Sequence, residues 1–389
     1  MEPIMKIENP KTIVNCWNEW DPLKRVIVGV PDGCMIAPSE PAVECKVPID
    51  SDMKGEWGPR PQHTVDAANE QLNYFVKQLE KRGVEVHRPI PINFNQPVKT
   101  PDFETQSMFG CCVPRDTLAP VGNELLEATM SYRCRWFEYL CTRPLIEKWY
   151  KQDPNMRWEA APKPRLTDRS YKPGYLQRVM TIEDRLKLTA AKDFVTTEEE
   201  PLFDAAELAR CGKDIIVQHG FTANEAGIDW LRRHFSKRGM RLHEIQFDGD
   251  YHHWHIDVCI MPLRPGLCIY NPYYMYLTPQ FEQLLKQNDW EMIPAVPPTH
   301  LYDMRIGTLN ERVGPYWISM NTLSIDPKTM CIEAHETGYQ EQINKMGIEV
   351  IPVDYADQVA FGGSLHCSTV DIYREGNCED YFPKQVEGY

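Results

Sequence analysis

Apolar residues recur at helical spacing along the chain, and each helical stretch leads through a break into a short apolar run. Residues 68–90 read ANEQLNYFVKQLEKRGVEVHRPI, in which Leu72, Phe75 and Leu79 share one helical face. Gly83 stands where a glycine commonly ends a helix, and the run after it is typical of a strand. The pattern predicts a helix followed by a strand.

Four further stretches show the same order of helix, break and strand. Thr222 and Glu225 have the spacing of a capping box, and Thr278 followed by Pro279 is typical of the first turn of a helix. The five units span residues 68–90, 135–161, 222–247, 278–296 and 334–353. Other apolar runs predict strands at residues 25–30, 213–218, 256–261, 266–270 and 317–325. The repeated unit favours a modular α/β fold over an ordinary α/β sheet whose helices merely look alike.

Composition narrows the class of function. The 389 residues carry a formal net charge of −14, which disfavours binding to nucleic-acid phosphates and to anionic membranes. No apolar run approaches the roughly 20 residues that cross a bilayer, and the start, MEPIMKIENPKTIV, lacks the apolar segment of a signal peptide. The 13 cysteines are scattered and include no CxxC pair, which disfavours a disulfide framework and a structural zinc site. We expect a cytoplasmic protein with mostly buried thiols.

Cys367 has the most informative surroundings of the cysteines. It lies in FGGSLHCSTVDIY, residues 361–373, where two glycines allow the backbone to turn sharply. A reactive thiol needs a lowered pKa, from a cation, a histidine or a helix N-terminus. A buried structural thiol is the alternative, and the motif alone does not exclude it.

A second polar group is DYHHWHIDVCI, residues 250–260. His255 and Asp257 fall on the same face of an extended chain, where the histidine could move protons and the aspartate could hold a cation. His252, His253 and His255 could instead bind a metal, although no second ligand cluster with recognisable spacing exists. A polar loop before a half-buried strand is the plainer alternative.

Two aspartates complete the candidate chemistry. Asp204 lies between apolar pairs in PLFDAAE, where a buried carboxylate would need a partner, and Asp102 follows a proline in KTPDFETQ. A helix cap or a turn is the alternative for both. A thiol, a histidine and several carboxylates are compatible with chemistry on a guanidinium. Carboxylates bind the planar cation, a thiolate attacks its carbon, and a histidine moves the protons.

Ten stretches of the chain, in order, resemble the arginine:glycine amidinotransferase family. They are NEWDPLKRVIVG (18–29), KTPDFE (99–104), PRDTL (114–118), VGNELLEA (121–128), RCRWFEY (133–139), AAPKP (160–164), DFVTTEEEPLFDAAE (193–207), HID (255–257), SMNTL (319–323) and GGSLHC (362–367). The resemblance implies the pentein fold, a five-bladed, pseudo-fivefold α/β propeller of ββαβ modules. It also implies a single domain over residues 1–389, with 1–14 as a disordered or extended tail and 150–202 as an insertion.

Matched position by position, the resemblance implies that Cys367 is the nucleophile, His255 the general acid and base, and Asp204 its orienting carboxylate. Asp102 and Asp257 would hold the guanidinium. The reaction would be ping-pong, because Cys367 takes the amidino group from L-arginine, ornithine leaves, and an acceptor amine then receives the group. We expect no cofactor, metal, nucleic acid or membrane. The oligomeric state, a homodimer included, stays open.

The sequence departs from the family pattern where the amino-acid end of the substrate binds. The family has an arginine in an Asn-Pro-Asp-Arg-Pro segment that binds the substrate carboxylate, and here 271–275 reads NPYYM, with Tyr274 in that place. Residues 314–316, GPY, replace the family's Ser-Ser-Lys. A carboxylate left poorly paired in a closed site is costly. We therefore expect Tyr274 to contact the substrate and the acceptor to be an amine other than glycine.

Among relatives, the cyanobacterial toxin-pathway amidinotransferases look most similar, partly because GGSLHC is followed by CEDYFPK at 378–384. The saxitoxin-type enzyme, which acts on an amino ketone, is favoured over the cylindrospermopsin-type enzyme, which acts on glycine. Alternatives stay open: a guanidine hydrolase such as a deiminase, a glycine amidinotransferase making guanidinoacetate, a metal-dependent enzyme, and a binding module without catalysis. For Cys111 and Cys112 we expect only buried thiols.

Overall fold

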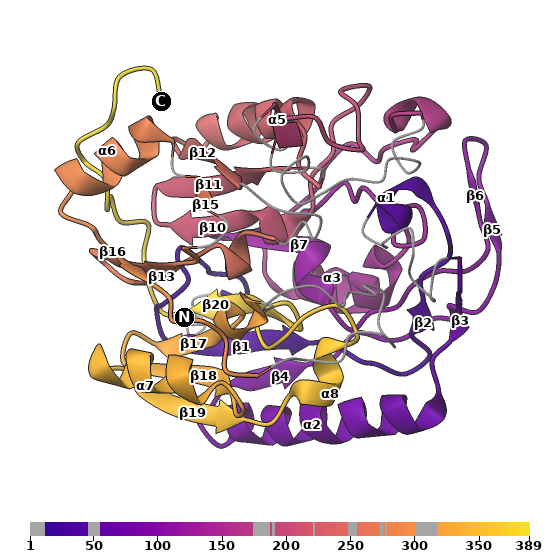
Figure 1. Cartoon of the computed structure of the whole chain (residues 1–389), viewed down its shortest axis with the longest axis horizontal. Coiled ribbons are helices and arrows are strands. Elements are labelled where there is room, and N and C mark those ends of the chain that lie inside the picture. The colour runs from indigo at the N-terminus through magenta and orange to yellow at the C-terminus, as the bar shows by residue number, and fades with distance from the viewer. Residues whose placement is uncertain are drawn as a thin grey trace, which may run out of the picture.

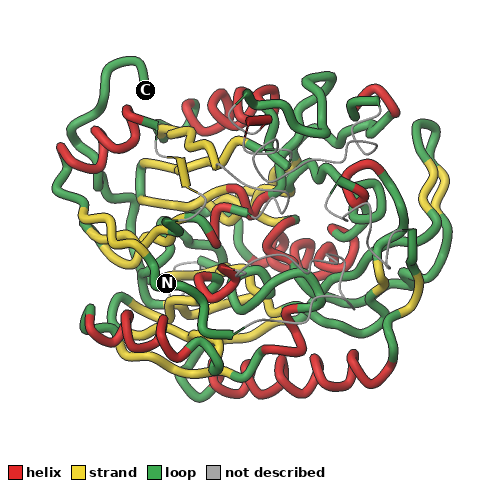
Figure 2. The backbone as a smooth tube through the Cα atoms, in the orientation of Figure 1, coloured by secondary structure: helices red, strands yellow, loops and turns green. Residues whose placement is uncertain are grey.

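The structure is a computed structural model that describes residues 12–45, 55–173, 187–188, 191–220, 222–247, 255–272, 275–276, 278–300 and 317–389. Five small sheets, each joined to one longer helix, form the frame of these residues. Figure 2 shows the strands mostly inside the molecule and several of the helices at its outer edges.

We call each sheet with its helix a module. In every module the first two strands are antiparallel, and the helix connects the second strand to a parallel third strand. The modules are β20 (Thr369–Arg374), β1 (Leu23–Val28) and β4 (Glu85–His87) with α2 (Gln62–Glu80); β7 (Leu118–Val121), β8 (Glu124–Glu127) and β9 (Arg157–Ala160) with α3 (Tyr139–Gln152); β10 (Leu208–Cys211), β11 (Asp214–His219), β12 (Arg241–Phe247) and an added β15 (Met275–Tyr276) with α5 (Glu225–Ser236); β13 (Ile260–Arg264), β14 (Leu267–Tyr270) and β16 (Glu291–Pro294) with α6 (Pro279–Gln287); and β17 (Leu323–Asp326), β18 (Thr329–Glu333) and β19 (Glu349–Val353) with α7 (Thr337–Lys345).

Short elements lie in the connections within and between the modules. They are the strands β2 (Met35–Ile36), β3 (Gly58–Pro59), β5 (Val98–Lys99) and β6 (Glu104–Thr105), the helices α1 (Pro41–Glu44) and α8 (Ala356–Val359), and the 3₁₀ helices η1 (Pro114–Asp116), η2 (Asp168–Ser170), η4 (Ala205–Glu207), η5 (Ile256–Val258) and η6 (Trp317–Met320). Four of the 3₁₀ helices, η1, η4, η5 and η6, stand just before the first strand of a module. They carry or adjoin most of the residues of the candidate site.

The two ends of the described chain complete one module together. Strand β20 pairs antiparallel with β1, so that Asp371 lies opposite Val26 and Thr369 opposite Val28, as Figure 1 shows with yellow beside indigo. The modules then contact one another in a closed cycle, through β20 and β7, β7 and η4, β10 and β13, η5 and η6, and β17 and β1. The predicted fold, five α/β modules of ββαβ type in a propeller, is confirmed.

The helices bury the faces that their apolar spacing predicts. Leu72, Phe75 and Leu79 of α2 are fully buried in one core cluster, and burying such a side chain contributes about 1.5–3 kcal/mol. Gly83, after the helix, has a φ of +79°, the left-handed region that glycine adopts easily. Thr278 caps α6 as predicted, because its side chain accepts a hydrogen bond from the backbone N–H of Phe281.

Other local predictions were wrong. Asn224, not Thr222, caps α5, since the Asn224 Oδ1 accepts from the Gly227 N–H at 2.8 Å while the Thr222 hydroxyl donates to Glu207. The runs 256–261 and 317–325 begin as the 3₁₀ helices η5 and η6 and turn into strands only further on. Apolar residues serve buried turns and buried strands equally well, so composition cannot separate them.

Two boundaries also need correction. Ile13 and Val14 belong to a buried cluster, and the Ile13 N–H donates to Asp153 at 2.7 Å, so the predicted tail is too long at its inner end. The predicted insertion is also too long, because residues 150–160 form the end of α3 and the strand β9. Within the described ranges, no helix is both long enough and apolar enough to cross a bilayer.

Candidate active site

Each module brings the segment before its first strand to a common region. The 3₁₀ helices η1, η4, η5 and η6 contact one another in sequence order, and η1 also contacts β20, which follows the loop of Cys367. The groups supplied in this way are, module by module, Asp116, Asp204, His255 with Asp257, Asn321, and Cys367. The fold thus gathers residues that are far apart in the chain. For example, the Arg115 side chain donates to the backbone carbonyl of His366, which is 251 positions away.

His255 and Asp204 form a pair. The His255 Nε2 lies 3.2 Å from the Asp204 Oδ2, and the other oxygen of Asp204 accepts from the N–H and the hydroxyl of Ser131 at 3.3 and 3.4 Å. Asp204 also stands at the N-cap of η4, but its side chain makes no capping bond. The structure therefore favours the histidine partner over the capping alternative.

The charges around His255 favour its protonated form. Its Nδ1 lies 3.6 Å from the Asp116 Oδ1. Burial lowers the pKa of His255, but the nearby carboxylates of Asp116, Asp204 and Glu207 outweigh burial and raise the pKa to about 9. At neutral pH the imidazole is therefore a proton donor, as a general acid must be.

The Cys367 sulfur contacts one hydrogen-bond acceptor and one hydrogen-bond donor. Its Sγ is 3.4 Å from the Asp257 Oδ2, and the Asn321 Nδ2 donates to the sulfur at 3.0 Å. Burial raises the pKa of the thiol well above its ordinary value, and the negative charges of Asp257 and Asp116 raise it further. A cation placed between these carboxylates would reverse that electrostatic effect.

A glycine allows the loop to fold tightly under the nucleophile. A Cβ atom on Gly363 would lie 2.4 Å from the Cβ of Cys367, a separation that no side chain tolerates. The turn that the GGSLHC sequence predicts is therefore present, and it places Cys367 directly before β20.

Asp116 and Asp257 are arranged alike. Each is almost fully buried, and each has one oxygen bound to a buried basic side chain: Asp116 Oδ2 accepts from Arg135 and Asp257 Oδ2 from the His366 Nδ1, both at 2.7 Å. The second oxygen of each carboxylate is buried without a hydrogen-bond partner among the described residues. A guanidinium, which presents five N–H donors in one plane, would satisfy both oxygens.

Asp102, by contrast, lies elsewhere. It stands on the β5–β6 hairpin, at the edge of the molecule in Figure 1, and its carboxylate pairs with the exposed Arg165 at 3.1 Å. This ion pair lowers the pKa of Asp102, and both residues line a polar surface hollow. The geometry gives no support to Asp102 as a guanidinium ligand, because no contact joins it to Cys367, His255 or Asp257 within the described chain.

A buried network of charges stands behind the site. The His366 Nε2 lies 3.5 Å from Glu19, which binds Arg210 through both oxygens. Arg210 in turn binds Asp371 at 2.9 Å. This alternation of charges fixes the ring of His366 and, through it, the carboxylate of Asp257.

Sequence reasoning missed three of these groups. Asp116, Asn321 and His366 stand in PRDTL, SMNTL and GGSLHC, which are stretches that carry the family resemblance. The available signal was a polar residue just before the first strand of each module. Tyr274, His252, His253 and residues 314–316 lie outside the described residues, so their predicted roles stay predictions.

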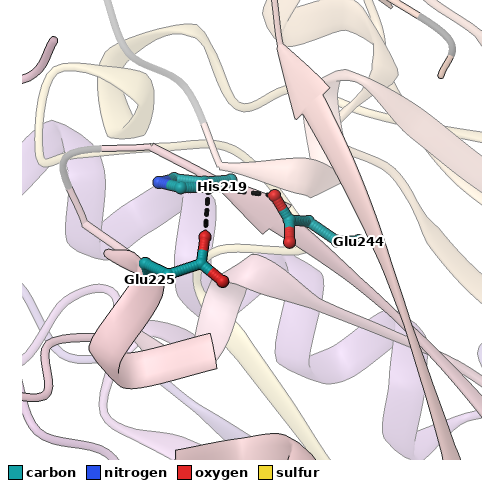
Figure 3. A group of neighbouring side chains, drawn as sticks. All are labelled: His219, Glu225 and Glu244. Carbon is teal, nitrogen blue, oxygen red and sulfur yellow. Dashed lines mark hydrogen bonds and ion pairs between the residues drawn. The ribbon is translucent and has the colours of Figure 1, made fainter. Parts of the chain in front are cut away.

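Two groups of side chains elsewhere have the composition of metal ligands. In the first, shown in Figure 3, the His219 Nδ1 lies 3.0 Å from Glu244 and 3.6 Å from Glu225. The Lys192 ammonium already lies 2.7 Å from the same Glu244 oxygen and balances the negative charge there. The second group is Glu333, His335 and Asp354. Neither group includes a residue of the site around Cys367, and we assign neither a metal.

Comparison with known proteins identifies the family. No protein-family model matches the chain. Over 376 residues it is 37% identical to the mitochondrial glycine amidinotransferase of Xenopus tropicalis, covering 94% of this chain and 84% of the relative. The chain belongs to the amidinotransferase family.

Other members of the amidinotransferase family match equally far along the chain. The L-arginine:L-lysine amidinotransferase of Pseudomonas savastanoi pv. phaseolicola is 34% identical over 374 residues, covering 94% of this chain and 95% of the relative. An amidinotransferase from Microseira wollei in the saxitoxin biosynthetic pathway has a solved structure that matches with a TM-score of 0.82 and 32% identity, over 95% of this chain and 99% of that one. The protein is an enzyme, an amidinotransferase.

Proposed function

We propose that this amidinotransferase carries the amidino group of L-arginine on Cys367 and passes it to an amine that lacks an α-carboxylate. One observation supports the covalent route most strongly. Two buried carboxylates, Asp116 and Asp257, each leave one oxygen without a hydrogen-bond partner, and both carboxylates raise the pKa of the Cys367 thiol. That arrangement suits a planar cation whose carbon meets the sulfur.

The first half-reaction follows from these charges. A guanidinium between Asp116 and Asp257 opposes the negative field that holds Cys367 as a thiol, so the thiol releases its proton to solvent and becomes a thiolate when the substrate binds. The thiolate attacks the guanidinium carbon. His255 gives its proton to the departing nitrogen, the carbon–nitrogen bond breaks, ornithine leaves, and the amidino group stays on sulfur.

The second half-reaction reverses the roles. His255 is now neutral and takes a proton from the acceptor amine as the amine attacks the amidino carbon. The carbon–sulfur bond breaks, and the product departs with the amidino group while Cys367 returns as a thiolate. A hydrolase would use water at this step, so the exclusion of water until the amine binds decides the outcome.

The acceptor is proposed from the sequence around the substrate's amino-acid end. Tyr274 and residues 314–316 replace groups that the family resemblance assigns to carboxylate binding. The matched relatives are named for glycine, for lysine and for the saxitoxin pathway, so acceptors vary within the family. An amino ketone of the saxitoxin type suits a sequence that has Tyr274 in place of the arginine, whereas glycine needs its carboxylate paired.

A discharge experiment tests the acceptor. The enzyme is loaded with L-arginine, freed of ornithine, and mixed with equal concentrations of glycine, L-lysine or an aliphatic amino ketone. We expect the amino ketone to remove the amidino group from Cys367 at least about tenfold faster than glycine, because a missing charged contact costs that much or more. Equal discharge by glycine would contradict the proposed acceptor. Urea released from the loaded enzyme without any amine, or citrulline formed while the enzyme is mixed with L-arginine, would instead identify a hydrolase.

A further inference from the structure

Asn321 is the group that the fifth module brings to the nucleophile. It follows η6 and stands just before β17, the place from which other modules supply Asp116, Asp204 and Asp257. Its side chain is buried, with 1% of the residue exposed. Neither half-reaction described above uses it.

The amide of Asn321 is fixed by four hydrogen bonds. Its Oδ1 accepts from the backbone N–H groups of Ser364, His366 and Cys367 at 3.1, 3.1 and 3.0 Å. A rotation of the amide by 180° would set its NH₂ group against three donors. The amide therefore has one orientation, in which Nδ2 points to the Cys367 Sγ at 3.0 Å.

This donor faces a sulfur whose other side-chain partner within the described chain is the carboxylate of Asp257 and which belongs to an apolar cluster. The titratable groups that interact with Cys367 are Asp257 on η5, Asp116 on η1 and Tyr355 before α8. Among the described residues, Asn321 is the side chain that donates a hydrogen bond to the sulfur. A bond to a charged acceptor is stronger than one to a neutral acceptor, so this bond favours the thiolate over the thiol.

We propose that Asn321 is a catalytic residue whose Nδ2–H group stabilises the thiolate of Cys367. No proton is transferred from the amide. The bond holds the thiolate before it attacks and again when it leaves the amidino carbon, and this second part rests on the proposed function. The alternative is a purely structural role, in which Asn321 only holds the backbone of the loop.

Alkylation of the free enzyme separates these roles. Below the pKa of a thiol, its rate of reaction with iodoacetamide follows the fraction of thiolate. The rate at Cys367 is followed at pH 8 by peptide mass spectrometry, and the exposed Cys378 serves as an internal reference. Asn321→Leu removes the donor without adding charge, and Asn321→Ala replaces it if the leucine variant does not fold. Asn321→Asp keeps the oxygen that holds the loop.

We expect both the neutral variant and Asn321→Asp to slow alkylation of Cys367 by about tenfold or more, because hydrogen bonds to charged groups have that strength. If the neutral variant is alkylated slowly but Asn321→Asp at the wild-type rate, the oxygen that holds the loop matters and the Nδ2 donor does not. A slow Asn321→Asp beside a normal neutral variant would show an effect of added charge. Either result, or no change in both, would overturn the proposal.

Gln358 offers a matched control. Its Nε2 donates to the Ser368 hydroxyl at 2.8 Å, and its Oε1 accepts from Cys112, so it supports the same loop without touching the sulfur. Gln358→Ala is expected to lower the melting temperature and to leave the alkylation rate of Cys367 within about twofold. No arginine is present in these experiments. If the wild type is alkylated at Cys367 as expected but takes up no amidino group in a separate experiment with L-arginine, the proposed function is refuted. The role of Asn321 toward the thiolate then still stands.

Discussion

The carboxylate of Asp116 and the hydrogen-bonded carboxylate of Asp204 together set the pH range in which His255 can act as an acid. The pKa of His255 is about 9, against an ordinary value of 6.5, although burial alone would lower it. Since one pKa unit corresponds to about 1.4 kcal/mol, the surrounding carboxylates stabilise the imidazolium by about 3 kcal/mol beyond the cost of burial. Asp204 supplies the hydrogen-bonded part of this stabilisation, at 3.2 Å.

Asp204→Asn keeps the shape of the side chain but removes its charge. We expect the pKa of His255 to fall by about one to two units. In the wild type the protonated form is present below about pH 9, so the first half-reaction slows as pH rises through that value. In the variant the same decline begins about one to two pH units lower, so its rate at pH 8.5 is about tenfold below the wild type. The difference shrinks toward pH 6.5.

The assay is rapid quenching after mixing with L-arginine, with the amidino adduct measured as intact mass between pH 6 and pH 10. Ser131→Ala is the control, because it removes a hydrogen bond to Asp204 and leaves every charge in place. We expect this control to decline at the wild-type pH. A decline at the same pH in Asp204→Asn and the wild type would refute the assignment of His255 as the acid.

Four further predictions concern the two candidate guanidinium ligands, the fold and the dependence on metal. Asp116→Asn should lower kcat/KM for L-arginine at least about 100-fold, since losing a buried charge partner costs about 3–5 kcal/mol. Asp102→Asn, which alters an exposed pair, should stay within about threefold in the same ornithine-release assay. Thr278→Ala should lower the free energy of unfolding by about 1 kcal/mol in urea titration and leave kcat unchanged. Dialysis against a chelator should leave activity intact, whereas alkylation of Cys367 should abolish it.

The sequence indicated the number and type of modules because each helix carries a regular apolar face that ends in a break. It could not show that β20 pairs with β1, since that contact joins the two ends of the described chain. Boundaries failed where buried turns have the composition of strands, as in η5 and η6.

The site was predicted in part for a similar reason. His255 and Asp204 were proposed as a pair, and the structure brings them together from different modules. Asp102 directly after Pro101 and Asp116 two residues after Pro114 both stand in stretches that match the family, so local sequence could not choose between them. Burial favours Asp116, which is 2% exposed beside His255, whereas Asp102 pairs with an exposed arginine, and the role of Asp102 stays a prediction.

The most direct test of covalent transfer is the intact mass of the enzyme after brief mixing with L-arginine, with Cys367→Ala measured alongside. We expect the wild type to gain one amidino group and to release ornithine, and the variant to gain nothing. An amidino group on Cys367→Ala, or ornithine released by that variant at the wild-type rate, would contradict the account.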